Sequence, residues 1–75
     1  MEFNRLLDVK GLNCPLPILR TKKALAEMSS GQVLCVQATD PGALKDFPAF
    51  ARQTGNELVE HREVDQVFEF FLKRK

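Results

Sequence analysis

The sequence predicts an α/β fold, specifically a two-layer α+β sandwich of four strands and two helices in the order βαβαββ. Three short apolar runs and one charged run read as strands, two segments of helical periodicity lie between them, and Gly, Pro, Asp or Ser clusters separate these segments. Right-handed crossovers place both helices on one face of the sheet. The other sheet face is therefore expected to be partly exposed. A chain of 75 residues suits one small domain, residues 1–75.

The first half of the chain reads as strand, helix, strand. Residues 6–9 form a short strand, and a helix is predicted from Pro15 to Met28 because proline suits the first helical position. The apolar stripe of this helix consists of Ile18, Thr21, Leu25 and Met28. Gly31 is predicted as its left-handed cap.

The second half begins with the clearest strand, residues 33–39, whose Leu34, Val36 and Ala38 should face the helices. The second helix is expected to start at an Asp46 N-cap and to stop at Gly55.

The last two strands, residues 57–64 and 66–72, should pair as an antiparallel hairpin because their connection is short. The first is charged and suits a sheet edge, whereas the second is apolar and suits the interior.

Composition excludes several classes of protein. Hydrophobic residues make up 44% of the chain, which argues against disorder, and the net charge of +1 gives no strong attraction to nucleic acid or membrane. No apolar run approaches the ~20 residues that cross a bilayer, and no secretory segment is visible. Two cysteines are too few for a disulfide scaffold, so a reducing cytoplasm is expected.

Cys14 is the candidate working residue, because Asn13 and Pro15 beside it are loop and cap residues rather than core residues. A helix N-terminus carries partial positive charge, and cations follow within two turns, so a moderately lowered thiol pKa is expected. These cations are Arg20, Lys22 and Lys23. Pro15 and Pro17 remove two backbone donors, which predicts an accessible thiol on a stiff turn.

Other cysteine chemistries lack their partners. There is no Cys-x-x-Cys pair, and two cysteines with one histidine do not make a zinc site, so neither metal nor cofactor is expected. His61 is expected to be exposed, and Cys35, in the middle of a strand, to be structural. A one-cysteine site that accepts a group and gives it up again remains.

The run Leu7-Asp8-Val9-Lys10-Gly11-Leu12-Asn13-Cys14-Pro15-Leu16-Pro17 resembles the Cys-Pro-x-Pro signature of the TusA/SirA family of small sulfur carriers. The likeness continues through Asp40-Pro41, Asp46-Phe47-Pro48 and Phe70-Phe71-Leu72-Lys73. It implies strand order 1-2-4-3, with the last strand antiparallel to the others.

The resemblance also implies a function. Cys14 would accept sulfane sulfur as a persulfide from a cysteine desulfurase and relay it to an acceptor protein. In the best-known case the route ends in 2-thiolation of the tRNA wobble uridine, and other members serve sulfur oxidation or molybdenum-cofactor supply. Such a protein is a stoichiometric carrier more than an enzyme.

Within that motif, Gly11, Pro15 and Pro17 would present the cysteine, and the basic residues at 20, 22 and 23 would suit partner docking or simply be a solvated helix face. Phe47 departs from the usual aliphatic residue, and Cys35 lies outside the family pattern. Two alternatives stay open: an RNA-binding module using residues 20–23 and 73–75, and a redox-regulatory adaptor. Neither membrane nor direct nucleic-acid contact is expected of the carrier.

Overall fold

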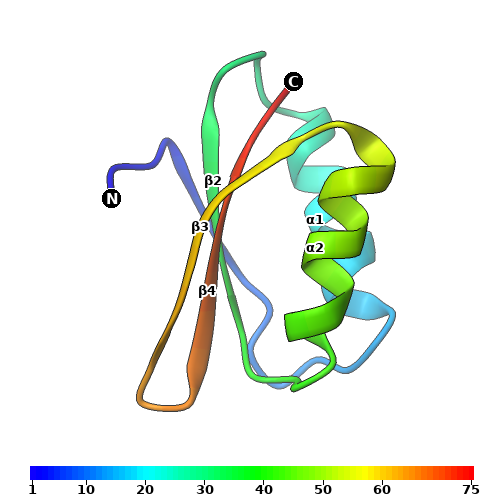
Figure 1. The fold of residues 1–75 in the computed structure, drawn as a ribbon, viewed down its shortest axis with the longest axis vertical. Coiled ribbons are helices and arrows are strands. Elements are labelled where there is room, and N and C mark those ends of the chain that lie inside the picture. Colours follow the sequence, from blue (N-terminus) through cyan, green and yellow to red (C-terminus); the bar gives the residue numbers. More distant parts are fainter.

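The computed structural model describes residues 1–75. Its elements follow in the order β1 (Arg5–Asp8), α1 (Leu16–Ala26), β2 (Val33–Ala38), α2 (Ala43–Thr54), β3 (Glu57–Val64) and β4 (Val67–Lys73). Both helices cover one face of a four-stranded sheet and form the second layer (Figure 1). The predicted βαβαββ two-layer fold is confirmed. Neither helix is long and apolar enough to span a bilayer.

The strand order is β1-β2-β4-β3, as expected. β1 pairs in parallel with β2, and β4 lies antiparallel to both β2 and β3. The charged β3 is therefore an edge strand, and the apolar β4 is central. The two-residue hairpin connection has positive φ at Asp65 (51°) and Gln66 (67°), the backbone of a type I′ turn, whose twist matches that of paired strands.

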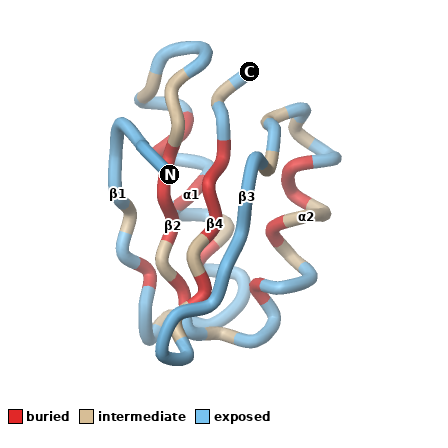
Figure 2. The backbone as a smooth tube through the Cα atoms, turned by 60° about the vertical axis from the view of Figure 1, so that its left-hand side comes forward, coloured by how far each residue is buried: buried red, intermediate tan, exposed pale blue.

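The main core lies between the sheet and the helices. Leu34, Val36 and Ala38 of β2 face the helices, as predicted, and are fully buried there. Figure 2 shows that buried residues concentrate in β2 and β4, while β3 is exposed except at Leu58, which packs against the core. Phe47 of α2 stacks on Phe70 of β4 with ring centroids 4.5 Å apart, which ties the second helix to the central strand.

The opposite face of the sheet is only partly exposed. Cys35 and Phe71 are buried there, because the Phe3 ring lies 6.2 Å from the Phe71 ring and the Arg62 guanidinium lies 5.5 Å above it. Leu6, which pairs with Cys35, remains half exposed.

A polar row also crosses this face. The carboxylate of Glu69 accepts hydrogen bonds from Arg62 Nε (2.6 Å) and Gln37 Nε2 (2.9 Å). Lys10 Nζ then donates to Gln37 Oε1 at 3.0 Å.

Two predicted helix boundaries, the end of α1 and the start of α2, are wrong. α1 begins at Leu16, so Pro15 is its N-cap residue, and it ends at Ala26, so Gly31 (φ +87°) belongs to the following turn. α2 begins at Ala43 after the turn at residues 40–42, which places Asp46 inside its first turn. The helix continues through Pro48 because burial of its apolar side outweighs one lost backbone hydrogen bond. Its predicted stop at Gly55 (φ +80°) is confirmed.

Candidate functional site

The loop that carries Cys14 starts where β1 ends. Because β1 and β2 are parallel, the loops that follow them lie at the same end of the sheet, where both helices begin (Figure 1). Val9 N donates to Gln37 O at 2.9 Å, and Gly11 N donates to Thr39 Oγ1 at 2.9 Å. Gly11 has φ +81°, which a residue with a side chain adopts only with strain. The first loop is thus fastened along the second.

Asp40 makes the connection that reaches Cys14 itself. Its Oδ2 accepts a hydrogen bond from the Cys14 amide at 3.0 Å, and its Oδ1 accepts one from the Gly42 amide at 3.2 Å. One carboxylate therefore holds the backbone of the cysteine against the start of α2. The sequence alone gives Asp40-Pro41 as part of the family likeness, and the bond to the Cys14 amide becomes visible only where the two loops lie side by side.

The two prolines differ in their surroundings. Pro15 is exposed at the N-cap of α1, and the Cys14–Pro15 peptide bond is cis. Pro17 is buried in the first turn, where its missing N–H costs nothing, and its carbonyl accepts a hydrogen bond from Thr21 Oγ1 at 2.8 Å. Leu16 N donates back to Asn13 O at 2.9 Å. The helix start is therefore held by the burial of Pro17 and by these two hydrogen bonds.

Cys14 is exposed and opens into a hollow of about 280 Å³ between the helices. Pro15 and Ile18 line it from the α1 side, and α2 contributes Asp46, Ala49, Phe50 and Gln53. We call this hollow the cysteine groove. Asp46 was expected only as a helix cap, yet its place in the first turn of α2 points it at the thiol. The sequence signal that could have identified Asp46 as a neighbour of the thiol is an acidic residue in the first turn of the second, parallel helix.

The electrostatics of Cys14 reverse the expectation from sequence. Its pKa is raised, first by partial desolvation of the thiol, then by the charge and hydrogen-bonding of the Asp46 carboxylate, and then by the charge of Asp40. A carboxylate beside a thiol disfavours the thiolate. The predicted moderate lowering of the pKa is therefore wrong, because the thiol is partly desolvated and the carboxylates of Asp46 in α2 and Asp40 in the turn before it act on it.

The three candidate docking cations do not share one surface, and none lines the cysteine groove. Lys22 faces a hollow between α1 and α2. Arg20 and Lys23 line a different hollow, on the β1 side of α1, together with Arg5 and Glu27. There Arg5 Nη1 binds Glu27 Oε1 at 2.9 Å. The structure thus separates Lys22 from the other two.

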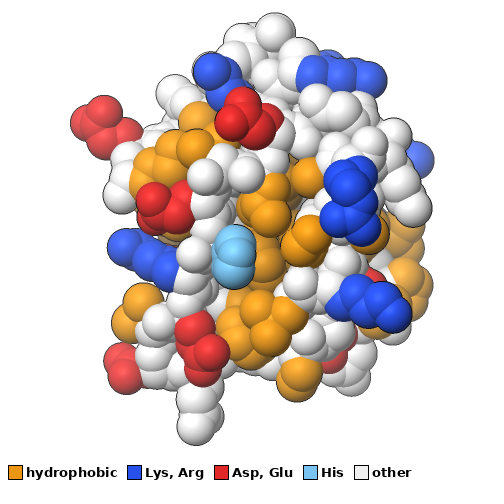
Figure 3. All heavy atoms as spheres, viewed as in Figure 1, with side chains coloured by type: hydrophobic (Ala, Val, Ile, Leu, Met, Phe, Trp, Pro, Cys, Tyr) orange, Lys and Arg blue, Asp and Glu red, His pale blue; other side chains and the backbone are white.

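The remaining candidate residues lie apart from Cys14. Cys35 is a free thiol, only 1% exposed on the far face of the sheet, where burial raises its pKa first and the Glu69 charge second. This agrees with the structural role expected for it. His61 is exposed on β3, where its ring lies 6.2 Å from Phe70 at the margin of an apolar strip (Figure 3). No three His, Cys, Asp or Glu side chains gather closely enough to hold a metal ion.

Known proteins are similar to this chain in sequence and in fold. Residues 5–74 match the family model described as sulfurtransferase TusA. The chain is 63% identical over 73 residues to the sulfur carrier protein TusA of Allochromatium vinosum, covering 97% of this chain and 96% of that protein. It is 59% identical over 69 residues to a putative sulfur carrier protein of Neisseria meningitidis, covering 92% and 93%.

Among solved structures, a SirA-like protein from Desulfitobacterium hafniense superposes with a TM-score of 0.83 at 30% sequence identity. The superposition covers 93% of this chain and 96% of that one.

Proposed function

The chain belongs to the TusA family of sulfur carriers, and we propose that Cys14 is the residue on which it carries sulfur. In this proposal a cysteine desulfurase supplies sulfane sulfur, Cys14 holds it as a persulfide, and an acceptor protein takes it. The observation that carries the assignment is an exposed free thiol on a loop fastened by Asp40, while Cys35 is buried on the far side of the sheet.

The chemistry is a pair of sulfur exchanges. The Cys14 thiolate attacks the outer sulfur of the donor persulfide, a new S–S bond forms, and the donor cysteine leaves as a thiolate. In the second exchange the acceptor thiolate attacks the outer sulfur of the Cys14 persulfide. A new S–S bond forms on the acceptor, and Cys14 leaves as a thiolate. Each step exchanges one S–S bond for another, so it consumes no oxidant or reductant. The carrier needs an accessible sulfur and a docking surface, and it does not need a catalytic base.

The local charges suit a carrier that is quiet between partners. Asp46 and Asp40 favour the neutral thiol in the free protein, and a neutral thiol is a poor nucleophile. We propose that a docked partner brings positive charge to the Cys14 end of the groove and thereby favours ionisation of the thiol to the thiolate. The fastened loop keeps the sulfur in one position while the partner approaches. On this view Gly11, Pro15 and Pro17 serve presentation more than pKa control.

For the destination of the sulfur, we propose 2-thiolation of the tRNA wobble uridine, with sulfur oxidation and molybdenum-cofactor supply as alternatives. A cytoplasmic setting suits any of them, because the exposed thiol has to stay reduced to be loaded. Deleting the gene and measuring thiolated wobble uridine by mass spectrometry of digested tRNA distinguishes these routes. Loss of the thiolated nucleoside supports the first, and an unchanged level contradicts it.

Intact-mass measurement tests the carrier role directly. After incubation with a cysteine desulfurase and cysteine, the wild-type chain is expected to gain one sulfur atom. Cys14→Ser should gain none, whereas Cys35→Ser, the matched control with the same chemical change at the buried thiol, should load as the wild type does. Equal loading of Cys14→Ser and wild type would overturn the assignment.

A further inference from the structure

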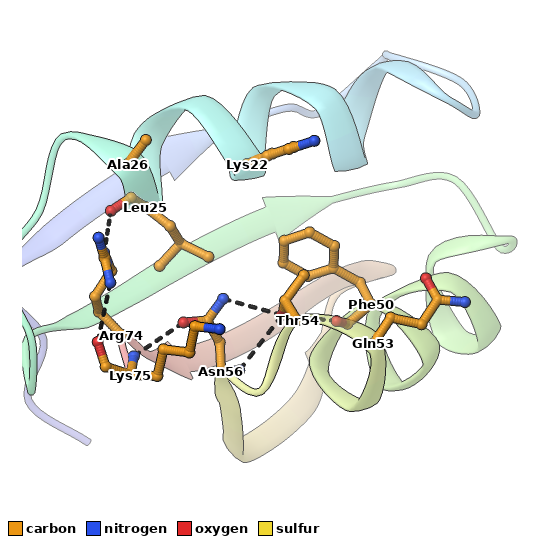
Figure 4. Close-up of a pocket in the computed structure, with 9 residues that line it drawn as sticks. All are labelled: Lys22, Leu25, Ala26, Phe50, Gln53, Thr54, Asn56, Arg74 and Lys75. Atoms are coloured by element: carbon orange, nitrogen blue, oxygen red, sulfur yellow. Dashed lines mark hydrogen bonds between the residues drawn. The ribbon is translucent and has the colours of Figure 1, made fainter.

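The cysteine groove continues along the seam between the helices. A second hollow of about 310 Å³ lies further along α1, and Phe50 and Gln53 line both hollows. Figure 4 shows this second hollow, with the Phe50 ring between the helices and the chain end opposite Lys22. The two hollows are therefore neighbours that share Phe50 and Gln53 as lining, and we treat the pair as one groove with Cys14 at one end.

The far end of this groove is positively charged. Its lining includes Lys22, Arg74 and Lys75 and no acidic residue, and none of the three forms a salt bridge within the chain. Arg74 donates from Nε to Leu25 O (2.8 Å) and from Nη1 to Lys75 O (2.9 Å). An arginine has five N–H donors, so the half-buried guanidinium is held in place with others still available. We call this end the cationic pocket.

The two ends of the groove have opposite charge. Asp46 lines the end at Cys14, and the cationic pocket holds the other end. Leu16, where α1 begins after the Cys14 loop, and Leu25, whose carbonyl holds Arg74, are nine residues apart in the helix, which corresponds to roughly 14 Å at 1.5 Å per residue. An extended peptide covers that distance in about four residues.

We propose that the cationic pocket takes an acidic side chain from the cysteine-bearing segment of the protein that exchanges sulfur with Cys14. This rests on the proposed carrier function. The partner segment lies along the groove with its reactive cysteine at Cys14 and a Glu or Asp about four residues away. The apolar floor made by Leu25, Ala26 and Phe50 accommodates the residues between. The charge polarity of the groove places the acidic residue at the end away from Cys14, whether it precedes or follows the partner's cysteine in the chain.

Charge complementarity favours a protein segment over a nucleic acid. An RNA strand in the groove would place phosphates beside Asp46 and Asp40 at the Cys14 end, where they are repelled. A peptide with one acidic residue satisfies the cationic pocket and leaves the other end free of like charge.

Short peptides with blocked ends test the proposal. The chain is first loaded on Cys14 with inorganic polysulfide, which needs no partner protein, and loading is checked by intact mass. Cys-Ser-Ser-Ser-Glu or its isomer Cys-Glu-Ser-Ser-Ser is then added, each also in reversed order. The peptide thiolate attacks the outer sulfur of the persulfide, Cys14 leaves as a thiolate, and the peptide becomes the persulfide. The measured quantity is the second-order rate of this transfer.

In either the forward or the reversed pair of peptides, the isomer with Glu four residues from Cys is expected to react about two- to fivefold faster than the isomer with Glu beside Cys. This is the range expected for one exposed ion pair. Lys22→Glu should abolish the preference. Lys23→Glu, with the same charge reversal on the neighbouring residue outside the groove, should keep it, and thermal midpoints confirm that both variants fold.

Equal rates for the isomers on the loaded wild type would overturn this inference and leave the carrier function standing. A chain that never takes up sulfur on Cys14 would contradict the carrier function instead. Single-stranded RNA that binds with Lys22-dependent affinity, together with no preference between the peptides, would assign the pocket to nucleic acid and also overturn the inference.

Discussion

Asp40 fastens the Cys14 loop to the start of α2, and its removal tests whether the thiol depends on that attachment. The carboxylate accepts hydrogen bonds from the amides of Cys14 (3.0 Å) and Gly42 (3.2 Å). Each such bond contributes about 0.5–1.5 kcal/mol net. Asp40 is half-buried, so water replaces part of what is lost. Asp40→Ala is therefore expected to lower the free energy of unfolding by about 1–2 kcal/mol.

Two measurements check this prediction. Urea unfolding gives the global loss, and amide hydrogen exchange by NMR gives the local one. The Cys14 amide should exchange at least about fivefold faster in Asp40→Ala, the ratio that corresponds to about 1 kcal/mol.

Asp40→Asn is the matched control, since its amide oxygen can still accept the Cys14 N–H while the Gly42 bond and the negative charge are lost. It should retain most of the slow exchange. Wild-type exchange at the Cys14 amide in Asp40→Ala would refute the reasoning, because the loop would then be held by other contacts.

Three further predictions concern the thiol, the core and the polar row. Asp46→Asn should lower the Cys14 pKa, because it removes the nearest negative charge, and alkylation by iodoacetamide at neutral pH should speed up; an unchanged titration curve would count against that role. Phe47→Ala should cost about 3–5 kcal/mol in urea unfolding, since the ring is fully buried, and a loss under about 1 kcal/mol would contradict the packing described. The Glu69 pKa is lowered, first by the hydrogen bond from Gln37, so its contribution to stability is present above the ordinary value of 4.5 and is lost as pH falls through the lowered pKa. Thermal midpoints of wild type and Glu69→Gln should therefore differ at pH 7 and converge in acid, and a constant difference would exclude this linkage.

Local pattern was enough to predict most of the fold. The alternation of apolar runs and helical periodicity predicted all six elements and both helices on one face. The charges of β3 and the apolar character of β4 predicted which strand is the edge and which is central, because a buried strand cannot carry unpaired charges. Helix starts were predicted less well. Asp46 has the residue type of an N-cap, but α2 had already begun at Ala43, where the turn after β2 brings the chain back over the sheet.

For the candidate site too, local sequence predicted some features and the tertiary structure decided the others. The sequence by itself pointed to Cys14, since a thiol between loop residues and a proline-rich helix start is a local pattern, and it placed Cys35 in a strand. It could not predict the charge around the thiol, because electrostatic energy depends on distance in space. Parallel pairing of β1 and β2 brings Asp40 and Asp46 to the sulfur from a loop and helix some 30 residues away in sequence.

The same tertiary arrangement divided the basic residues of α1. Lys22 and Lys23 are neighbours in sequence and equivalent in composition, but they point about 100° apart around the helix. Only the position of α2 decides that Lys22 faces the groove with Arg74 and Lys75, while Lys23 faces the β1 side. Sequence determined which residue is the candidate site and the fold that presents it. The packing of the two helices decided the charges that the thiol and a docking partner meet, because those charges come from segments that only folding brings together.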